Sequence, residues 1–314
     1  MAYKVLDLFS GAGGLSRGFY DAGYDVVLGV DFDEAALKTF KENHGKAEAM
    51  KLDLFDHSNI DVIINFLEEK DIKLDVLVGG PPCQGFSVAG PRDMNDKRNT
   101  LYTAMVKLAE QVKPQAVVLE NVPGMVQTNG GIGAKRVVED FAKIGYRMVP
   151  KLLYGPFYDE EHHKKRKSHD IPETNITWHK PRYHNLRDMD TFKILALDIE
   201  TGRREYDSKK ISELYEKKVG SKSPIHRYHV LEPDLPSTTI IAHLYKDGNR
   251  FIHYDSSQSR SITVREAARL QSFDDDFDFV GSQGNAYQMI GNAVPPQLAK
   301  RVALALSKML DEIE

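Results

Sequence analysis

The stretch KVLDLFSGAGGLSRGFYDAGYDVVLGVD, residues 4–31, decides the fold. It starts as a short apolar run, passes through a glycine-rich loop, continues with helical spacing and ends in a second apolar run. Short continuous apolar runs indicate strands that are buried on both faces. Glycines let the backbone approach a ligand closely, and the start of a helix adds N–H groups that the helix does not use. The stretch therefore predicts a strand, a ligand-binding loop, a helix and a second strand.

The same alternation continues as far as Pro150. Further strands are predicted at 47–54, 74–80 and 115–122, and helices at 34–44, 60–70 and 99–112. Strands that alternate with helices form a parallel sheet covered on both faces, so the fold class is α/β. Ligands of such sheets bind beyond the carboxyl ends of the strands. In this chain those ends carry Phe9 to Gly14, Asp31, Asp53, Gly80 to Cys83, and Glu120 with Asn121.

The second part of the chain is less regular. Residues 154–223 are polar and charged, with helical spacing only near 188–201 and 208–218. Order returns at 261–273, and the chain ends in a predicted helix at 295–310 that we expect to return to the first domain. We therefore predict a nucleotide-type domain at 1–160 plus 283–314, and a smaller irregular domain at 161–282.

Composition limits the function classes. The chain has 314 residues, of which 41% are hydrophobic and 28% charged, as in ordinary globular proteins. No apolar run reaches the roughly 18–20 residues that cross a bilayer, and the N-terminus lacks the order of a secretory signal. A single cysteine excludes an internal disulfide framework and favours a reducing compartment. The net charge of −4 means that a polyanionic partner would need a local basic region.

The glycine loop alone has two interpretations, a nucleotide-like cofactor site or a structural turn. Gly11 and Gly13 fit the dinucleotide pattern G-x-G-x-x-G, and Asp31 follows at the expected distance of about 20 residues. However, Ser16 occupies the place of the third glycine. Asp7 lies just before the loop, beside a site that could bind a cation.

The only cysteine lies in DVLVGGPPCQGFS, residues 75–87. A lone cysteine is usually a small buried hydrophobic residue. Here it follows two glycines and two prolines, directly after a predicted strand, so a stiff loop holds the thiol at the edge of the sheet. This position favours a nucleophile.

Five motifs then occur together in a fixed order: DLFSGAGGLSRGF, GGPPCQGFS, LENV, TVREAARLQSF and YQMIGNAVPP. By their order and spacing the chain resembles the DNA (cytosine-5)-methyltransferases of bacterial restriction-modification systems. The resemblance covers nearly the whole chain outside about 155–225. It implies a Rossmann-like domain that uses S-adenosylmethionine, leaves S-adenosylhomocysteine, and is joined to a target-recognition domain.

The resemblance also implies a mechanism. The thiolate of Cys83 attacks C6 of a cytosine that has been flipped out of duplex DNA, and C5 then takes the methyl group. Glu120 holds or protonates N3 of the ring, and Asn121 orients the loop. No metal site is implied. By position, the cofactor-binding residues are Phe9, Gly11, Ala12, Gly13, Gly14, Asp31, Phe32, Asp53, Leu54, Pro81, Leu101, Asn292 and Val294.

The DNA contacts follow less directly. Ser87 and Arg98 would lie on a loop that closes over the DNA, and Thr239 in LPSTTIIAHL matches a recognition stretch of relatives. Residues 162–187 hold seven basic and two acidic residues, a local excess of about five that suits phosphate contacts. The family's Gln-x-Arg-x-Arg motif is absent. By register alone, Lys164 and Arg166 replace its two arginines, and Arg166 is the candidate contact to the cytosine.

This departure leaves alternatives open. One is a DNA-binding relative with impaired catalysis, and another is an RNA cytosine-5 methyltransferase. A nicotinamide dehydrogenase is suggested by the glycine loop alone. For the main interpretation we expect double-stranded DNA as the substrate and a monomer in the bacterial cytoplasm, associated with the nucleoid through DNA. A cognate restriction endonuclease is a further expected partner.

Overall fold

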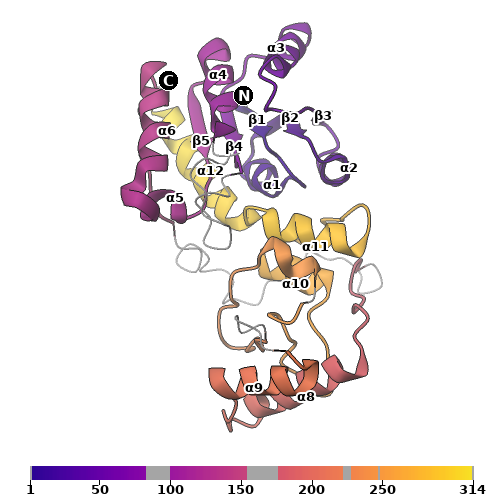
Figure 1. Ribbon diagram of the computed structural model, residues 1–314. Coiled ribbons are helices and arrows are strands. Elements are labelled where there is room, and N and C mark those ends of the chain that lie inside the picture. The colour runs from indigo at the N-terminus through magenta and orange to yellow at the C-terminus, as the bar shows by residue number, and fades with distance from the viewer. Residues whose placement is uncertain (1, 83–99, 154–175, 222–227, 247, 313–314) are drawn as a thin grey trace. The chain divides into compact units, whose positions relative to one another are not determined.

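The computed structural model describes residues 2–82, 100–153, 176–221, 228–246 and 248–312. The chain divides into two compact units, residues 1–166 with 293–314 and residues 167–292. The first unit contains the sheet, and the second contains helices joined by long irregular segments (Figure 1). Residues 283–292, which the sequence placed in the first domain, group with the second unit because they pack against its other helices.

Within the described residues the first unit has a five-stranded parallel sheet in the order β3-β2-β1-β4-β5. In register, Leu8 of β1 pairs with Val30 of β2 and with Gly79 of β4, so neighbouring strands end together. The strand order reverses between β1 and β4, which is where ligands of such sheets bind. All the predicted strands are present, and the α/β prediction is confirmed. The strands are β1 (Lys4–Leu8), β2 (Asp25–Asp31), β3 (Glu48–Lys51), β4 (Val76–Gly79) and β5 (Ala116–Leu119).

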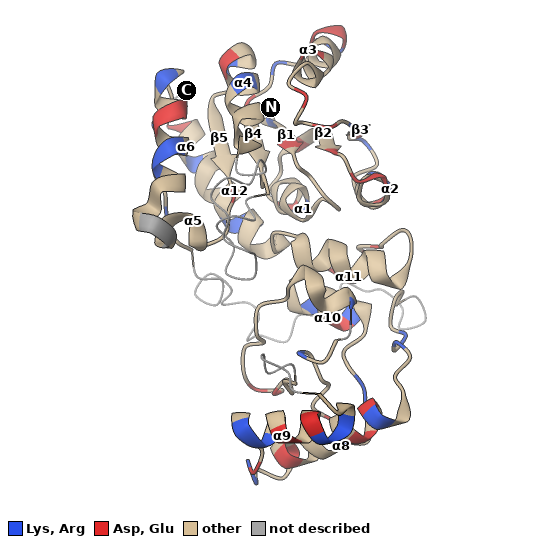
Figure 2. Ribbon diagram, in the orientation of Figure 1, with Lys and Arg blue, Asp and Glu red and all other residues tan. Residues whose placement is uncertain are grey.

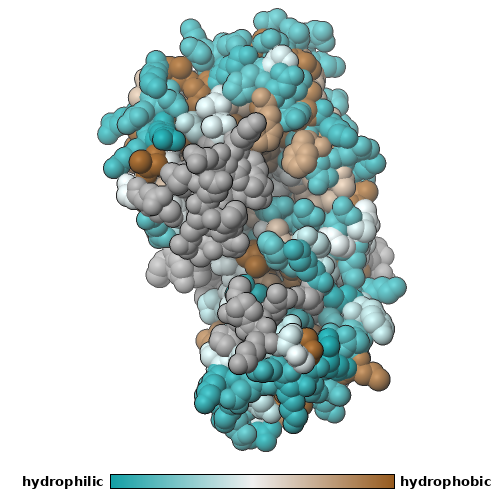
Figure 3. All heavy atoms as spheres, in the orientation of Figure 1, coloured by the Kyte–Doolittle hydropathy of each residue, from teal (hydrophilic) through white to brown (hydrophobic). Residues whose placement is uncertain are grey.

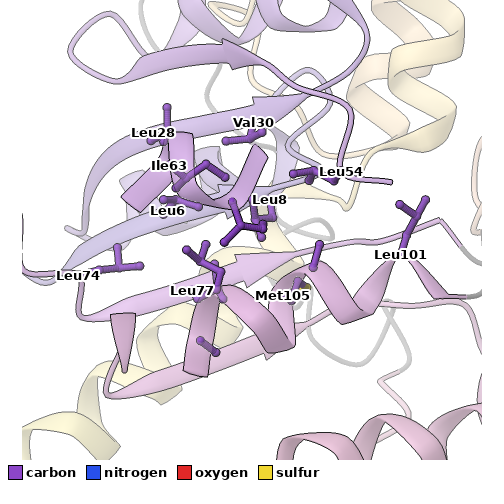
Figure 4. Packing of buried hydrophobic residues seen from close by; sticks show 14 of the residues in the cluster. Leu6, Leu8, Leu28, Val30, Leu54, Ile63, Leu74, Leu77, Leu101 and Met105 are labelled. Atoms are coloured by element: carbon purple, nitrogen blue, oxygen red, sulfur yellow. The ribbon is translucent and has the colours of Figure 1, made fainter. Parts of the chain in front are cut away.

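Helices cover both faces of this sheet. On one face, α3, α4 and α6 pack against leucines of β1, β2 and β4, and Figure 4 shows part of this core. On the other face, α1, α2 and α12 pack against the valines that alternate with those leucines. The helices of this unit are α1 (Gly14–Asp21), α2 (Glu34–Asn43), α3 (Asn59–Glu69), α4 (Tyr102–Val112), α5 (Gly124–Gln127), the 3₁₀ helix η2 (Thr128–Gly131), α6 (Ile132–Lys143) and α12 (Pro296–Asp311).

The C-terminal helix packs directly against the helix that follows the glycine loop. Gly18 of α1 meets α12 so closely that an added Cβ would lie within 2.5 Å of backbone atoms of Pro296 and Lys300. Tyr24 strengthens the contact, because its hydroxyl donates to the carbonyl of Ala303 at 3.0 Å. The end of the chain therefore holds the glycine loop in place through α1.

We expect Gly18→Ala to lower the free energy of unfolding by about 1–3 kcal/mol, because backbone atoms cannot move aside as a side chain can. Gly45→Ala is the matched control, since an added Cβ there meets nothing within 4 Å. Urea denaturation of both variants measures the difference. Equal stability of the two variants would show that the α1–α12 contact adapts to the extra methyl group.

The second unit is built around two helices and a buried arginine. Phe192, Leu195 and Ala196 of α8 pack with Tyr228 and Ile252, and the inner face of α9 covers this cluster. Three helices of this unit begin at a residue whose side chain caps the backbone: Asn185 for α8, Asp207 for α9 and Thr263 for α10. The elements are α8 (Leu186–Glu200), α9 (Ser208–Val219), the 3₁₀ helix η4 (Ala242–Tyr245), α10 (Val264–Leu270) and α11 (Gln283–Asn292).

Arg265 of α10 is fully buried and connects two distant segments. Its guanidinium donates to the carbonyl and hydroxyl of Thr177 and to the carbonyls of Asp274 and Phe277. Trp178 adds a second link, because its indole N–H donates to Asp278 and to the carbonyl of Phe279 at 2.9 Å. Arg265 thus has a structural role in the second unit.

Candidate active site

The carboxyl ends of the five strands gather the polar and glycine-rich residues of the first unit at one edge of the sheet. The loop after β1 starts at Phe9, β2 ends at Asp31, and β4 leads into Gly80 and Pro81. Beyond β5, the backbone N–H of Glu120 still donates to the carbonyl of Gly79 at 2.9 Å. The sequence predicted this grouping, and the parallel register produces it.

The glycine loop turns sharply before it enters α1. Phe9 and Gly13 both have positive φ, 66° and 93°, and the N–H of Gly13 donates to the carbonyl of Ser10 at 2.8 Å. A Cβ on Gly13 would overlap the ring of His44, so only glycine fits there. In contrast, a Cβ on Gly11 would meet nothing within 4 Å. The N-cap residue of α1, Gly13, makes no side-chain bond to the first turn, so the N–H groups of that turn, apart from that of Ser16, which bonds to Asp7, can bond a ligand.

Asp31 holds the glycine loop and the start of α2 together. One carboxylate oxygen accepts from the N–H of Gly11 and the other from the N–H of Asp33, both at 2.9 Å. Desolvation by burial raises the pKa of Asp31, and the two backbone hydrogen bonds oppose that shift. Each oxygen keeps a second lone pair, so Asp31 can also accept from a hydroxyl group of a ligand.

Ser16 explains why the loop departs from the dinucleotide pattern. It is buried in α1, and its hydroxyl donates to the carboxylate of Asp7 at 2.6 Å. Glycine at this position would leave that buried carboxylate with less support. The glycine that lets α1 pack closely is instead Gly18.

Glu120 and Asn121 follow β5 and adjoin the strand end that carries the predicted nucleophile. A Cβ on Gly80 would come within 3.1 Å of a carboxylate oxygen of Glu120. Glu120 as a residue is exposed, but the atoms around its carboxyl group desolvate it and raise its pKa. The side-chain amide of Asn121 donates to the carbonyl of Pro81 at 3.1 Å. This bond fixes the backbone two residues before Cys83.

An acidic group follows β3, and an exposed aromatic ring follows β2. Asp53 is exposed, and its carboxylate accepts from the N–H of Phe55 at 3.0 Å. Leu54 turns the other way, into the core. Phe32, beyond β2, is 72% exposed, which is unusual for a phenylalanine and leaves its ring open to a flat ligand.

The sequence did not predict the contact between residues 53–58, which follow β3, and α4. The carbonyl of His57 accepts from Lys107 at 2.9 Å, and the imidazole of His57 lies 3.3 Å from the hydroxyl of Thr103. Only the nearness of 53–58 and α4 in the fold reveals the contact, since no local pattern signals it.

Three predicted cofactor residues do not belong to the loops at the strand ends. Two of them pack in the cores of the first unit, and the third belongs to the second unit. Leu101, just before α4, is buried in the same core as Leu54, and Val294 packs beside α12. Asn292 ends α11 in the second unit, where it is exposed. A role for these residues at the cofactor stays a prediction.

Several predicted residues lie outside the described residues: Cys83, Ser87, Arg98, Lys164 and Arg166. Thr239 is described and is exposed in the second unit. No group of three or more potential metal ligands occurs within the described ranges. None of the helices described is long and apolar enough to cross a membrane. Hydrophobic residues are scattered on the face that Figure 3 shows.

Arg182, one of the basic residues of the predicted phosphate-binding segment 162–187, is not available to bind phosphate. Its guanidinium stacks on the ring of Tyr287 at 4.1 Å and donates to the carbonyl of Leu244 at 2.8 Å. It is therefore a packing residue and not a free cation. Arg187 lies 3.2 Å from the carboxylate of Asp188, although it remains exposed. Acidic and basic residues are also interleaved along α8 and α9 (Figure 2).

Comparison with known proteins agrees with this geometry. The family model described as C-5 cytosine-specific DNA methylase matches residues 3–168 and 158–308. The type II methyltransferase M1.HphI of Haemophilus parahaemolyticus is 31% identical, over 98% of this chain and 88% of its own. The type II methyltransferase M.FnuDI of Fusobacterium nucleatum is 30% identical, over 99% and 96%.

Solved structures share the fold. The crystal structure of the Dnmt2 methyltransferase of S. pombe superimposes with a TM-score of 0.58 at 19% identity, and covers 98% of this chain and 99% of its own. Similarity at this level of identity supports the architecture, a Rossmann-like α/β domain with a smaller second domain.

Proposed function

Because the chain belongs to the C-5 cytosine-specific DNA methylase family, it methylates cytosine in DNA, and we propose that its S-adenosylmethionine binds at the carboxyl edge of the sheet. The supporting observation is the parallel register, which brings the loop after β1, Asp31, Pro81 and Glu120 to one edge. The predicted enzyme class is confirmed, and the dehydrogenase alternative is set aside.

The residues at this edge fit the chemical groups of that cofactor. The open space at Gly11 and the uncapped first turn of α1 suit the carboxylate of its methionine part. Asp31 accepts from the ribose hydroxyls, and the exposed ring of Phe32 stacks on adenine, whose amino group donates to Asp53. When bound, S-adenosylmethionine supplies a methyl group on a positively charged sulfur. The remaining work falls to side chains of this chain.

Cys83 and Glu120 act on the cytosine ring in this proposal. The thiolate of Cys83 forms a bond to C6, and the electron pair of the C5–C6 double bond becomes available at C5. Glu120 donates a hydrogen bond or a proton to N3, where negative charge develops. Its raised pKa supports the protonated form that this role needs. After methylation the proton on C5 is removed and the sulfur–carbon bond breaks, so the thiolate is restored.

The second unit selects the DNA sequence in this proposal. The target base must leave the duplex to reach C6 and C5, so a separate surface has to hold the DNA. Thr239 is an exposed candidate contact there, and Lys164 and Arg166 are candidates in the basic segment before it. Ser87 and Arg98 are candidates beside Cys83. The type II relatives favour a partner endonuclease that cuts the same sequence.

The experiment that tests this function measures transfer of a labelled methyl group from S-adenosylmethionine to duplex DNA. Bisulfite sequencing of DNA from cells that express the protein identifies the methylated cytosines. We expect one short sequence to be methylated. An equal rate on transfer RNA, or no transfer to DNA at all, would contradict the proposal.

We expect Asp31→Ala to weaken S-adenosylmethionine binding by about 10–100-fold, because hydrogen bonds to a charged group contribute about 1.5–3 kcal/mol. Titration calorimetry measures the Kd. Asp33→Ala is the matched control: it removes the α2 cap, at about 1 kcal/mol of stability, and leaves Asp31 in place. If both variants change the Kd equally, Asp31 acts only through the fold.

A further inference from the structure

A buried carboxyl group lies directly below the glycine loop. Asp7, in β1, has no exposed surface and precedes Phe9 by two residues. One of its oxygens accepts from Ser16, but the other is buried and has no hydrogen-bond partner among the described residues. The hydroxyl of Ser10, in the loop itself, is buried and equally without a partner.

No positive charge is paired with Asp7 in the described part of the chain. On β2 the nearest ionisable group is Asp31, which is also acidic, and β4 contributes none, with the sequence VLVG. On α1, Arg17 bonds to Asp21, and α12 meets α1 through the backbone at Gly18. His44, against the loop, is neutral near pH 7, because burial lowers its pKa to about 4.

An ionised carboxylate in such a place lacks a counterion. Burial of a charge without a partner is unfavourable, so the group tends to take up a proton instead. Burial and the charge of Asp31 raise the pKa of Asp7 to about 7, although the bond from Ser16 acts in the opposite direction. Near neutral pH, a cation bound nearby would therefore favour the ionised form.

We propose that Asp7 makes the cofactor site sensitive to charge, so that its carboxylate strengthens binding of the positively charged sulfonium donor relative to the neutral thioether product. This inference rests on the proposed function, in which the cofactor binds over the glycine loop. The donor and the product differ by one methyl group and one positive charge at the sulfur. A buried, uncompensated carboxylate distinguishes the two by their charge, and it thereby favours exchange of spent product for fresh donor.

The test is titration calorimetry without DNA, with S-adenosylmethionine and S-adenosylhomocysteine as separate ligands, from pH 5.5 to 8.5. The measured quantity is the ratio of the product Kd to the donor Kd. Contacts that both ligands make in the same way, such as those of the ribose hydroxyls, affect both constants alike and cancel in the ratio.

In the wild type we expect this ratio to rise by about tenfold as the pH increases through 7, the scale of one charge–charge interaction over several ångströms. The direction of this change follows from the ionisation of Asp7. Below its pKa Asp7 is neutral and cannot distinguish the ligands, whereas above its pKa the carboxylate favours the cation. Asp7→Asn keeps an acceptor for Ser16 and removes the charge, so its ratio should stay flat with pH. Ser16→Ala is the matched control: it removes the side-chain hydrogen bond and keeps the carboxyl group, so its ratio should still rise with pH, but at a higher pH than in the wild type.

Each other result would overturn the inference. A wild-type ratio that does not change with pH means that Asp7 does not act through its charge. A loss of affinity in Asp7→Asn that is equal for both ligands, with an unchanged ratio, assigns Asp7 a structural role only. If the wild type binds neither ligand, the assignment of the cofactor itself fails. That result differs from a ratio that does not change with pH, which contradicts only the role of Asp7.

Discussion

Cys83→Ser is expected to reduce methyl transfer to DNA by more than about 10³-fold, the scale of removing a covalent nucleophile. A thiolate adds reversibly to the soft C6 carbon, whereas a serine hydroxyl at neutral pH is both less ionised and less nucleophilic. The two side chains differ by one atom, so the loop that Asn121 holds through the carbonyl of Pro81 should keep its place. The loss should therefore lie in the chemical step.

The measurement combines a rate with a binding constant. Transfer of a labelled methyl group gives the rate, and calorimetry gives the Kd of S-adenosylmethionine, which we expect to stay within about twofold of the wild type. Gln115→Ser is a matched control, because Gln115 is exposed at the opposite edge of the sheet, just before β5 begins. That variant should keep the wild-type rate.

A covalent adduct gives independent evidence. In duplex DNA that carries 5-fluorocytosine at the target, fluorine cannot leave C5 as a cation, so the bond between sulfur and C6 persists. The chain has one cysteine, so mass spectrometry of the adduct assigns the modified thiol without ambiguity. Transfer by Cys83→Ser at a rate near that of the wild type, or an adduct on another residue, would refute this role for the thiol.

The sheet was predictable because its central strands are short runs rich in valine and leucine. Strands buried on both faces are mostly apolar: β4 is apolar throughout, and inside β1 only Asp7 interrupts the apolar run. Among the described residues, the helices α5, α6 and α11 were not predicted. α6 has an apolar spacing, Val137 and Phe141, that a closer reading of the sequence could have found.

α11 could not be found from local preference. Its sequence, QGNAYQMIGN, contains glycines and asparagines that disfavour a helix interior. Tertiary contacts decide its structure instead. Tyr287 is buried and its hydroxyl donates to the carbonyl of Ile262 at 2.7 Å, while Gly291 packs against the backbone of Ile241 and Ala242.

The strand-end grouping of the site followed from the sequence for a geometric reason. Parallel strands end at the same edge, so residues that follow successive strands, such as Phe9, Asp31 and Glu120, must approach one another. The hydrogen bonds that join a side chain to a distant part of the backbone could not be predicted from the sequence. The contact from Asn121 to Pro81 joins residues 40 positions apart, and the stacking of Arg182 on Tyr287 depends on the fold of the second unit. Composition made Arg182 look like a free cation, because a count of charges does not reveal packing.

Glu120→Gln is expected to slow methyl transfer by about 10²–10⁴-fold, the usual contribution of a general acid. Glutamine can still donate a hydrogen bond to N3, but it cannot give up a proton as charge develops on the ring. In the wild type, desolvation of the carboxyl group raises the pKa of Glu120 and so keeps more of it protonated than a fully solvated glutamate would be. Because the two side chains have nearly the same shape, DNA affinity should change little, so the loss should appear in kcat and not in KM.

Single-turnover transfer at saturating DNA measures the chemical step directly, and gel-shift titration measures DNA affinity. Glu69→Gln is the matched control, because this exposed carboxylate ends α3 and should leave both quantities unchanged. If Glu120→Gln loses DNA affinity and keeps its single-turnover rate, Glu120 grips the base without supplying a proton. An unchanged rate and affinity would remove it from the site, and the raised pKa would then reflect only its desolvated position beside Gly80.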